Sequence, residues 1–199
     1  MPTSNTMKLK PSAQICICAL VKVTLQQATA TAITILISNS KIASFRSEAV
    51  ADELCNYYRH NTIVDTILCL DGMEVVGTCL ADRLTSGDYV NMNAHQTIYV
   101  VTPESVNSSQ LLFRDNIVPM IQGKHVLVLA VSVATGRTVE AAVDAVKYYG
   151  GEVAGIASIF ATSHECSGYT VNSVFDPNDL PDYKTIHLMI AQCAKRRKD

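Results

Sequence analysis

The sequence predicts an α/β fold: an open, twisted, mostly parallel sheet with helices on both of its faces. The first indication is the apolar run 126–131, which continues without alternation and therefore suits a strand buried on both sides. The second indication is a change of period after this run, where apolar residues recur at helical spacing: Val139, Ala142, Val143 and Val146. Strands that alternate with such helices are typical of parallel sheets, because the crossover helices cover both faces.

The N-terminal part of the chain predicts less regular elements. Residues 13–27 form a weak helix candidate, because their β-branched content disfavours a helix, and the Thr- and Ile-rich residues 30–38 form a strand candidate. Ser47 is the expected N-cap of the next helix. The apolar face of that helix is expected to carry Val50, Leu54 and Tyr57.

A second strand–turn–helix unit is expected before the central one. Residues 62–70 form a strand candidate that ends in Asp71-Gly72, and a helix with an apolar face follows at once. A polar loop is expected over 88–95, a strand over 96–102, and a loop or hairpin over 106–115. Two further strands are expected over 152–162 and 168–175.

Length and composition favour one soluble domain over residues 1–199, with its core at about 30–180. A net charge of −2 gives no reason to expect nucleic acid or an anionic membrane as a partner. The seven cysteines show no CxxC spacing, which predicts neither a zinc site nor a disulfide framework. With no signal peptide and no apolar run of the roughly 18 residues that a membrane helix needs, a cytoplasmic protein is expected.

The turn after the central strand is a candidate phosphate site. It comprises Ala134, Thr135, Gly136, Arg137 and Thr138. At the start of a helix, backbone N–H groups lack intrahelical partners and point the same way as the positive end of the helix dipole, which suits an anion. An ordinary turn capped by Ser or Thr fits this local pattern equally well. The turn has neither the lysine of a Walker A loop nor the three glycines of a dinucleotide fingerprint.

The stretch 126–138 resembles the signature of the type I phosphoribosyltransferases. In that family a hydrophobic strand is followed by two acidic residues, small residues and Thr-Gly-x-Thr, and the last part reads here Thr135-Gly136-Arg137-Thr138. The resemblance, which is closest in layout to the orotate branch, implies that residues 134–138 bind the 5′-phosphate of phosphoribosyl pyrophosphate (PRPP). It also implies a homodimer, and a small hood built from both termini.

The same resemblance places Asp71, Gly72 and Met73 in the loop that binds the pyrophosphate. On the residues alone, an ordinary turn with an Asp cap is as good an interpretation. His125 begins the central strand at the end away from the phosphate turn, so a structural role is expected for it. The adjacent residues 164–166 (His-Glu-Cys) are not expected to converge on a metal.

The sequence departs from the family pattern at the acidic pair, whose carboxylates bind the ribose hydroxyls. Ala130 and Val131 stand at these positions, and Arg114 is the only cation between Arg83 and Lys124, where the family has a basic flap. Because phosphoribosyl transfer depends on electrostatic stabilisation, both departures would weaken catalysis, and no catalytic residue is assigned. Glu74 or Asp144 could replace the missing pair if the fold brings either of them to the site.

Three functions stay open. The first is an active phosphoribosyltransferase, which uses Mg²⁺ and transfers phosphoribosyl from PRPP to a nucleobase. The second, which the replaced acidic pair favours, is a catalytically degenerate protein that binds a nucleotide or phosphosugar as a sensor or regulatory subunit. The third is a fold relic that binds nothing at this turn. The acceptor base is not indicated, because residues 160–163 (Phe-Ala-Thr-Ser) stand where the orotate branch has an Asp-Arg pair.

Overall fold

The computed structural model describes residues 44–86, 91–106 and 110–175. The elements expected at 13–27 and 30–38, the terminal hood and the C-terminal segment lie outside these residues.

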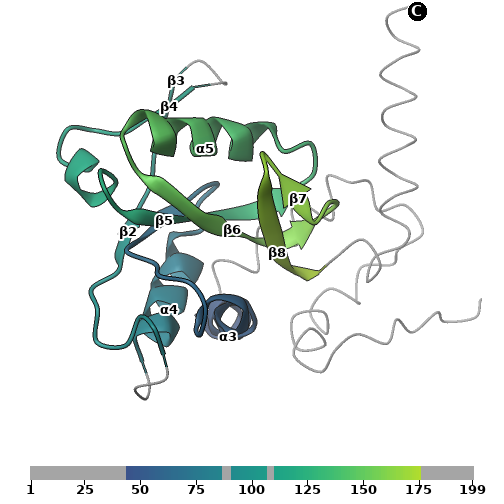
Figure 1. Cartoon of the computed structure of the whole chain (residues 1–199). Coiled ribbons are helices and arrows are strands. Elements are labelled where there is room, and N and C mark those ends of the chain that lie inside the picture. Colours follow the sequence, from purple (N-terminus) through teal and green to yellow (C-terminus); the bar gives the residue numbers. More distant parts are fainter. Residues whose placement is uncertain (1–43, 87–90, 107–109, 176–199) are drawn as a thin grey trace, which may run out of the picture.

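A six-stranded sheet forms the centre of the described molecule, in the order β2-β1-β5-β6-β8-β7 (Figure 1). Its strands, in chain order, are β1 (Thr66–Cys69), β2 (Tyr99–Val101), β5 (His125–Val133), β6 (Glu152–Ala161), β7 (Glu165–Cys166) and β8 (Tyr169–Phe175). All neighbouring pairs are parallel except β7 and β8. The predicted mostly parallel α/β sheet is therefore confirmed.

Helices cover both faces of this sheet, as predicted. Helices α3 (Ser44–Tyr58) and α4 (Glu74–Thr85) pack on one face, and α5 (Arg137–Tyr148) packs on the other (Figure 1). The side chains of β5 divide between the two layers because they alternate along the strand. Leu127, Leu129 and Val131 belong to the core under α3 and α4, whereas Val126, Val128 and Ala130 belong to the core under α5.

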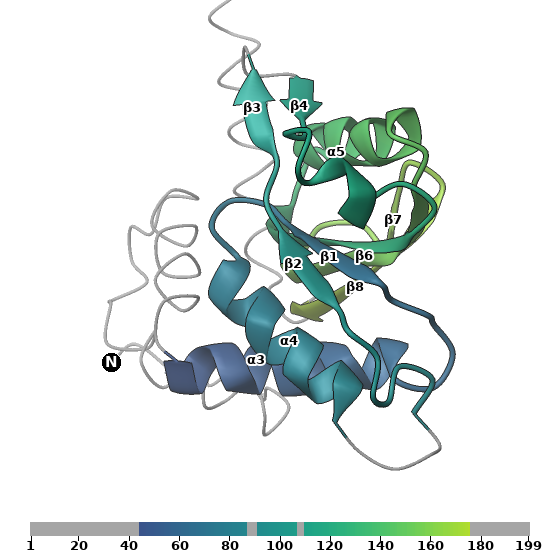
Figure 2. The ribbon, with the colours of Figure 1, turned by 90° about the vertical axis from the view of Figure 1, so that its left-hand side faces the viewer.

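A small antiparallel hairpin follows β2 and confirms the loop or hairpin expected there. It consists of β3 (Glu104–Val106) and β4 (Gln110–Leu112), and the short 3-10 helix η2 (Val118–Met120) leads from it toward β5. Figure 2 shows the hairpin standing beside α5, beyond the edge of the main sheet.

Helix α3 corrects two expectations. The helix begins at Ser44, so Ser47 lies inside its first turn and is fully buried; it is not the N-cap. Tyr57 is 37% exposed, and Tyr58 takes the expected place in the core, four residues after Leu54. The Tyr58 hydroxyl donates a 2.8 Å hydrogen bond to the carbonyl oxygen of Ile156 on β6.

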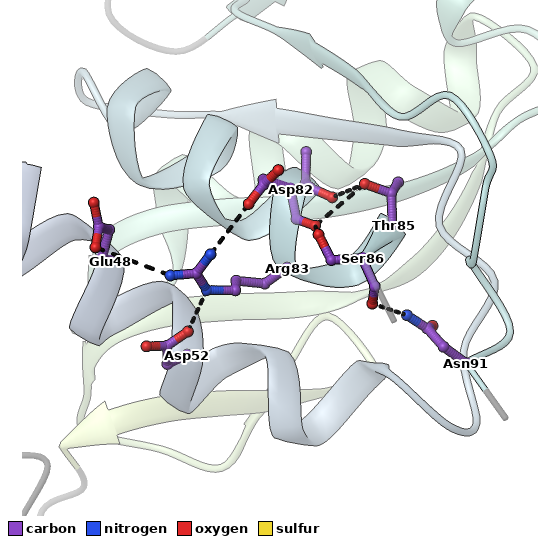
Figure 3. A network of polar contacts seen from close by, with 8 residues as sticks. Glu48, Asp52, Asp82, Arg83, Thr85, Ser86 and Asn91 are labelled. Carbon is purple, nitrogen blue, oxygen red and sulfur yellow. Dashed lines mark hydrogen bonds and ion pairs between the residues drawn. The ribbon is translucent and has the colours of Figure 1, made fainter. Parts of the chain in front are cut away.

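Polar contacts on the outer side join α3 to α4 (Figure 3). The guanidinium of Arg83 lies 2.5 Å from Asp52, 3.1 Å from Asp82 and 3.9 Å from Glu48. Exposed ion pairs of this kind contribute little individually, about 0–1 kcal/mol, so the buried apolar contacts between the helices and the sheet dominate the stability of this layer.

Two strands of the sheet differ in length from the expectation. The strand expected over 62–70 is confirmed but narrows to β1, because the Val64 amide donates to the Asn93 side chain (2.9 Å). Conversely, β5 continues through Ser132 to Val133, beyond the point where its apolar run ends. No helix within the described ranges is long and apolar enough to cross a membrane.

Candidate functional site

Two strand-to-helix turns meet at the carboxyl edge of the sheet. Strands β1 and β5 are parallel neighbours, with Cys69 opposite Leu129, so the turns after both strands open on the same side. Between them lies a pocket of about 620 Å³. Its lining comes from β1 and the loop after it, from the connection between β2 and the hairpin, from β4, and from the starts of α4 and α5. The lining residues are Cys69, Leu70, Asp71, Gly72, Glu74, Thr102, Pro103, Leu111, Arg137, Thr138 and Ala141.

Gly136 shapes the predicted phosphate turn. It is the residue before α5 and has φ 79°, a left-handed conformation that glycine adopts without steric cost. No side chain caps this helix end, so the Ser or Thr cap expected for an ordinary turn is not formed. The first-turn amides of α5, at Arg137, Thr138 and Val139, have no carbonyl partner within the helix because of their position. The turn therefore presents N–H donors beside the pocket.

Thr162, which directly follows β6, and Cys166 on β7 hold this turn from behind. The Thr162 hydroxyl donates to the Ala134 carbonyl oxygen at 2.9 Å, and the Thr162 amide donates to that of Val133 at 2.9 Å. The Cys166 thiol lies 3.8 Å from the Gly136 carbonyl oxygen. The turn's carbonyl oxygens thus have protein partners, which reduces the repulsion that an anion would meet. Sequence reasoning missed Thr162 and Cys166, because they contact residues about thirty positions away.

The residues of the predicted phosphate turn differ in how close they come to the pocket. Arg137 and Thr138 line it with exposed side chains. Ala134, Thr135 and Gly136 form the turn itself and do not line the pocket.

Ala130 and Val131 do not reach the pocket. Ala130 is 1% exposed and Val131 is 4% exposed, and they point into the two opposite cores. The continuation of β5 to Val133 keeps both positions within the strand. The site thus receives no hydrogen-bond acceptor from the side chains at the two positions where the resemblance calls for carboxylates.

The loop after β1 supplies acidic groups to the pocket. Asp71 (φ 53°) and Gly72 (φ 74°) are both left-handed, exposed and at the pocket wall. Met73 corrects the expectation for this loop: its side chain is fully buried in the core, and its amide donates to the Leu70 carbonyl oxygen at 3.2 Å. Of the two acidic residues considered as replacements for the missing pair, Glu74 lines the pocket and Asp144 does not.

The thiol and the arginine side chains in and near the pocket limit the reactions that it could catalyse. Burial, with a smaller contribution from the nearby Glu74 charge, raises the pKa of the Cys69 thiol to about 12, so this sulfur is protonated at neutral pH and is a poor nucleophile. Arg114, the expected flap cation, is held by Glu104 through a 2.6 Å bond from its Nε. Among the described residues that line the pocket, Arg137 is the one with a cationic side chain.

The residues fit a Mg²⁺ ion only if the ligand shares in binding it. Within the described residues, no group of three His, Cys, Asp or Glu side chains could hold a metal. Asp71 and Glu74 nevertheless line one pocket, and Mg²⁺ commonly binds one or two carboxylates together with substrate phosphate oxygens.

Comparison with solved structures shows the fold. No protein-family model and no curated protein matches this sequence. The orotate phosphoribosyltransferase of Mycobacterium tuberculosis in complex with PRPP is 16% identical, with a TM-score of 0.57 over 87% of this chain and 93% of that chain. The UMP synthase of Leishmania donovani is 14% identical, with a TM-score of 0.52 over 78% of this chain and 35% of that chain. The chain therefore has the fold of the type I phosphoribosyltransferases, as the resemblance predicted.

Proposed function

We propose that this protein binds the phosphate group of a phosphosugar or nucleotide at the start of α5 and does not catalyse phosphoribosyl transfer. One observation carries the proposal: Arg137 and Thr138 line a pocket at a helix start whose first amides have no partner within the helix, while Ala130 and Val131 are buried away from it. The binding half of the family's signature is thus built into the site, and the ribose-binding half is not.

The proposed contacts follow from the geometry of the turn. Phosphate oxygens would accept hydrogen bonds from the amides at 137–139 and from the Thr138 hydroxyl, and the Arg137 guanidinium would add a charge-assisted bond. The sugar would extend along Thr102 and Pro103, which connect β2 to the hairpin, and along Leu111 on β4.

The described residues of the site supply little of the charge stabilisation that phosphoribosyl transfer needs. Phosphoribosyl transfer releases pyrophosphate, and its developing negative charge needs cations or aligned donors. Arg114 is already paired with Glu104, and the buried positions 130 and 131 cannot orient the ribose. Removing one well-placed electrostatic group commonly costs on the order of 10²–10³ in rate, so the combined loss would be severe.

An active phosphoribosyltransferase is the second candidate, because the pocket joins both turns that the resemblance assigns to PRPP. In that case Asp71 and Glu74 would hold Mg²⁺ jointly with the ligand, and the metal would offset charge on the pyrophosphate. A homodimer and a cytoplasmic location stay predictions under either candidate.

Calorimetric titration with ribose 5-phosphate tests the proposed site. We expect Arg137→Ala and Thr138→Ala each to weaken binding about tenfold, because each removes a donor to a charged group. Lys124→Ala is the matched control for charge, since Lys124 precedes β5 at the opposite edge of the sheet, and it should change affinity less than about twofold. Unchanged affinity in both pocket variants would contradict the phosphate site.

A turnover assay separates the two candidate functions. With PRPP, Mg²⁺ and a panel of nucleobases, we expect no release of pyrophosphate above the background without protein. Release that depends on a particular base, and that disappears in Arg137→Ala, would show an active enzyme and overturn the degenerate interpretation.

A further inference from the structure

We infer that Thr162 positions the phosphate turn: its hydroxyl holds the Ala134 carbonyl oxygen on the β6 side and so turns the Thr135 amide toward the pocket. This inference rests on the proposed function, since it concerns the same site. The resemblance does not assign such a role, because residues 160–163 stand where the orotate branch has an Asp-Arg pair. Thr162 thus acts on the ligand through the backbone of the turn and does not touch it.

The register of the sheet places Thr162 beside the start of the turn. Strands β5 and β6 are parallel, and Val133 at the end of β5 pairs with Ala161 at the end of β6. One step further, the Thr162 amide donates to the Val133 carbonyl oxygen at 2.9 Å. Ala134 and Thr162 therefore leave the sheet side by side, and a side chain at 162 can reach the backbone of the turn.

The Thr162 hydroxyl continues this pairing by one bond. It lies 2.9 Å from the Ala134 carbonyl oxygen and 3.3 Å from that of Val133. Because a hydroxyl has one proton to donate, and the Val133 oxygen already accepts the Thr162 amide, the bond to Ala134 is the one that matters for the turn. Thr162 is half-buried, which limits the competition of water for the same oxygen.

The planarity of the peptide bond transmits this contact to the next amide. In a trans peptide, the carbonyl group of one residue and the N–H group of the next point in opposite directions. No peptide bond in the described part of the chain is cis. With its oxygen held on the β6 side, the Ala134 carbonyl sends the Thr135 N–H toward the other side of β5. Strand β1 and the loop that lines the pocket lie on that side.

Loss of the hydroxyl would remove this orientation. The Ala134 carbonyl oxygen would lose its side-chain partner, and the peptide plane between residues 134 and 135 would be free to rotate. A rotated plane would turn a carbonyl oxygen toward the phosphate, whose oxygens repel it, and would withdraw one N–H donor. Binding of the phosphate group itself would weaken, whatever the ligand carries beyond it.

Calorimetric titrations with inorganic phosphate and with ribose 5-phosphate test this inference. In Thr162→Val, which keeps a β-branched side chain but lacks the hydroxyl, we expect the affinity for both ligands to fall about fivefold. The factor should be the same for both ligands, because Thr162 acts only on the donors to the phosphate. Thr162→Ser keeps the hydroxyl and should bind within about twofold of the native protein. Thr162→Ala removes the hydroxyl without placing a methyl group beside the turn, and it serves as the test if the valine variant does not fold.

Thr66→Val is the matched control. The Thr66 hydroxyl also donates to a backbone carbonyl oxygen, that of Met120, but it does so at the amino end of β1. This variant should lower the free energy of unfolding in urea denaturation, as Thr162→Val does, while its affinity for phosphate should change less than about twofold. An equal loss of affinity in this control would show that general destabilisation is the cause, and it would overturn the inference.

Two further outcomes would overturn it. One is unchanged affinity in the variants of Thr162 that lack the hydroxyl; if Arg137→Ala still weakens binding, the proposed function stands. The other is a loss confined to ribose 5-phosphate, which would place the effect at the sugar. If the native protein binds neither ligand, the proposed function fails and the inference fails with it.

Discussion

Gly136 is the residue on which the geometry of the phosphate turn depends. Its φ of 79° lies in a region where a residue with a Cβ costs about 1–2 kcal/mol. A Cβ at this position would also lie 2.8 Å from the Cys166 sulfur, closer than the two atoms can pack. The residue therefore has to be glycine for two reasons, one intrinsic to the backbone and one due to its neighbour on β7.

Substitution of Gly136 should separate these two reasons. We expect Gly136→Ala to lower the free energy of unfolding by about 2–4 kcal/mol in urea denaturation, from left-handed strain and the contact with Cys166. Gly168→Ala is the matched control, because Gly168 has the same φ of 79° with nothing within 4 Å of the added Cβ, so it should lose only about 1–2 kcal/mol. Equal losses in the two variants would contradict a role for the Cys166 contact. Cys166→Ala should recover part of the difference.

Among the elements, strand β5 has a different role at each of its two ends. At its amino end, the Asp65 carboxylate accepts the His125 amide at 2.8 Å and lies 2.9 Å from the His125 ring nitrogen Nδ1. This confirms the structural role expected for His125. At its carboxyl end, β5 leads into the turn that begins α5. The contact between Asp65 and His125 thus fixes the amino end of β5, and the carboxyl end of the same strand positions the ligand site.

The contact at the amino edge predicts a pH dependence of stability. Burial alone would raise the pKa of Asp65, but the hydrogen bonds from His125 and the charges of His125 and Lys124 together hold it below its ordinary value. A carboxyl group with a lowered pKa stabilises the fold above its unfolded pKa of about 4, and the contribution disappears as the pH falls through the folded value.

We expect Asp65→Asn to lower the free energy of unfolding at pH 7 by about 1–3 kcal/mol. The gap between native protein and variant should narrow as the pH falls below the unfolded pKa of about 4 and through the lower pKa of the folded carboxyl. Denaturation curves recorded from pH 3 to pH 7 measure this gap, with the exposed Asp115→Asn as the control. A gap that stays constant over this range would show that the ionised carboxylate is not the stabilising group.

The elements that could be predicted from sequence are those whose pattern is local. Strands β5 and β6 and helices α4 and α5 follow from apolar runs and helical spacing, which burial imposes directly. Strand β7 was not predicted, because its two residues lie in the polar stretch 164–166. The Ser167-Gly168 dipeptide after it is the signal that could have revealed the hairpin, since both residues have positive φ.

In the molecule as a whole, the order of the strands in the sheet brings the parts of the site together. Sequence placed the turns at 71–73 and 134–138 at the ends of two strands, and their meeting follows from β1 and β5 being parallel neighbours. The wall formed by Leu111 could not be foreseen, because the hairpin reaches the pocket by packing against α5. The burial of Ala130 and Val131 likewise depends on how far β5 extends, which its apolar run does not show.

In the molecule as a whole, phosphate is expected to bind at the carboxyl edge of the sheet, at the start of α5. Two-dimensional ¹H–¹⁵N NMR of the full chain, titrated with ribose 5-phosphate, tests it most directly. We expect saturable shifts at the amides of residues 136–139, and none at His125 or Glu152 on the amino edge. Shifts that do not saturate, or that gather away from the start of α5, would contradict the account.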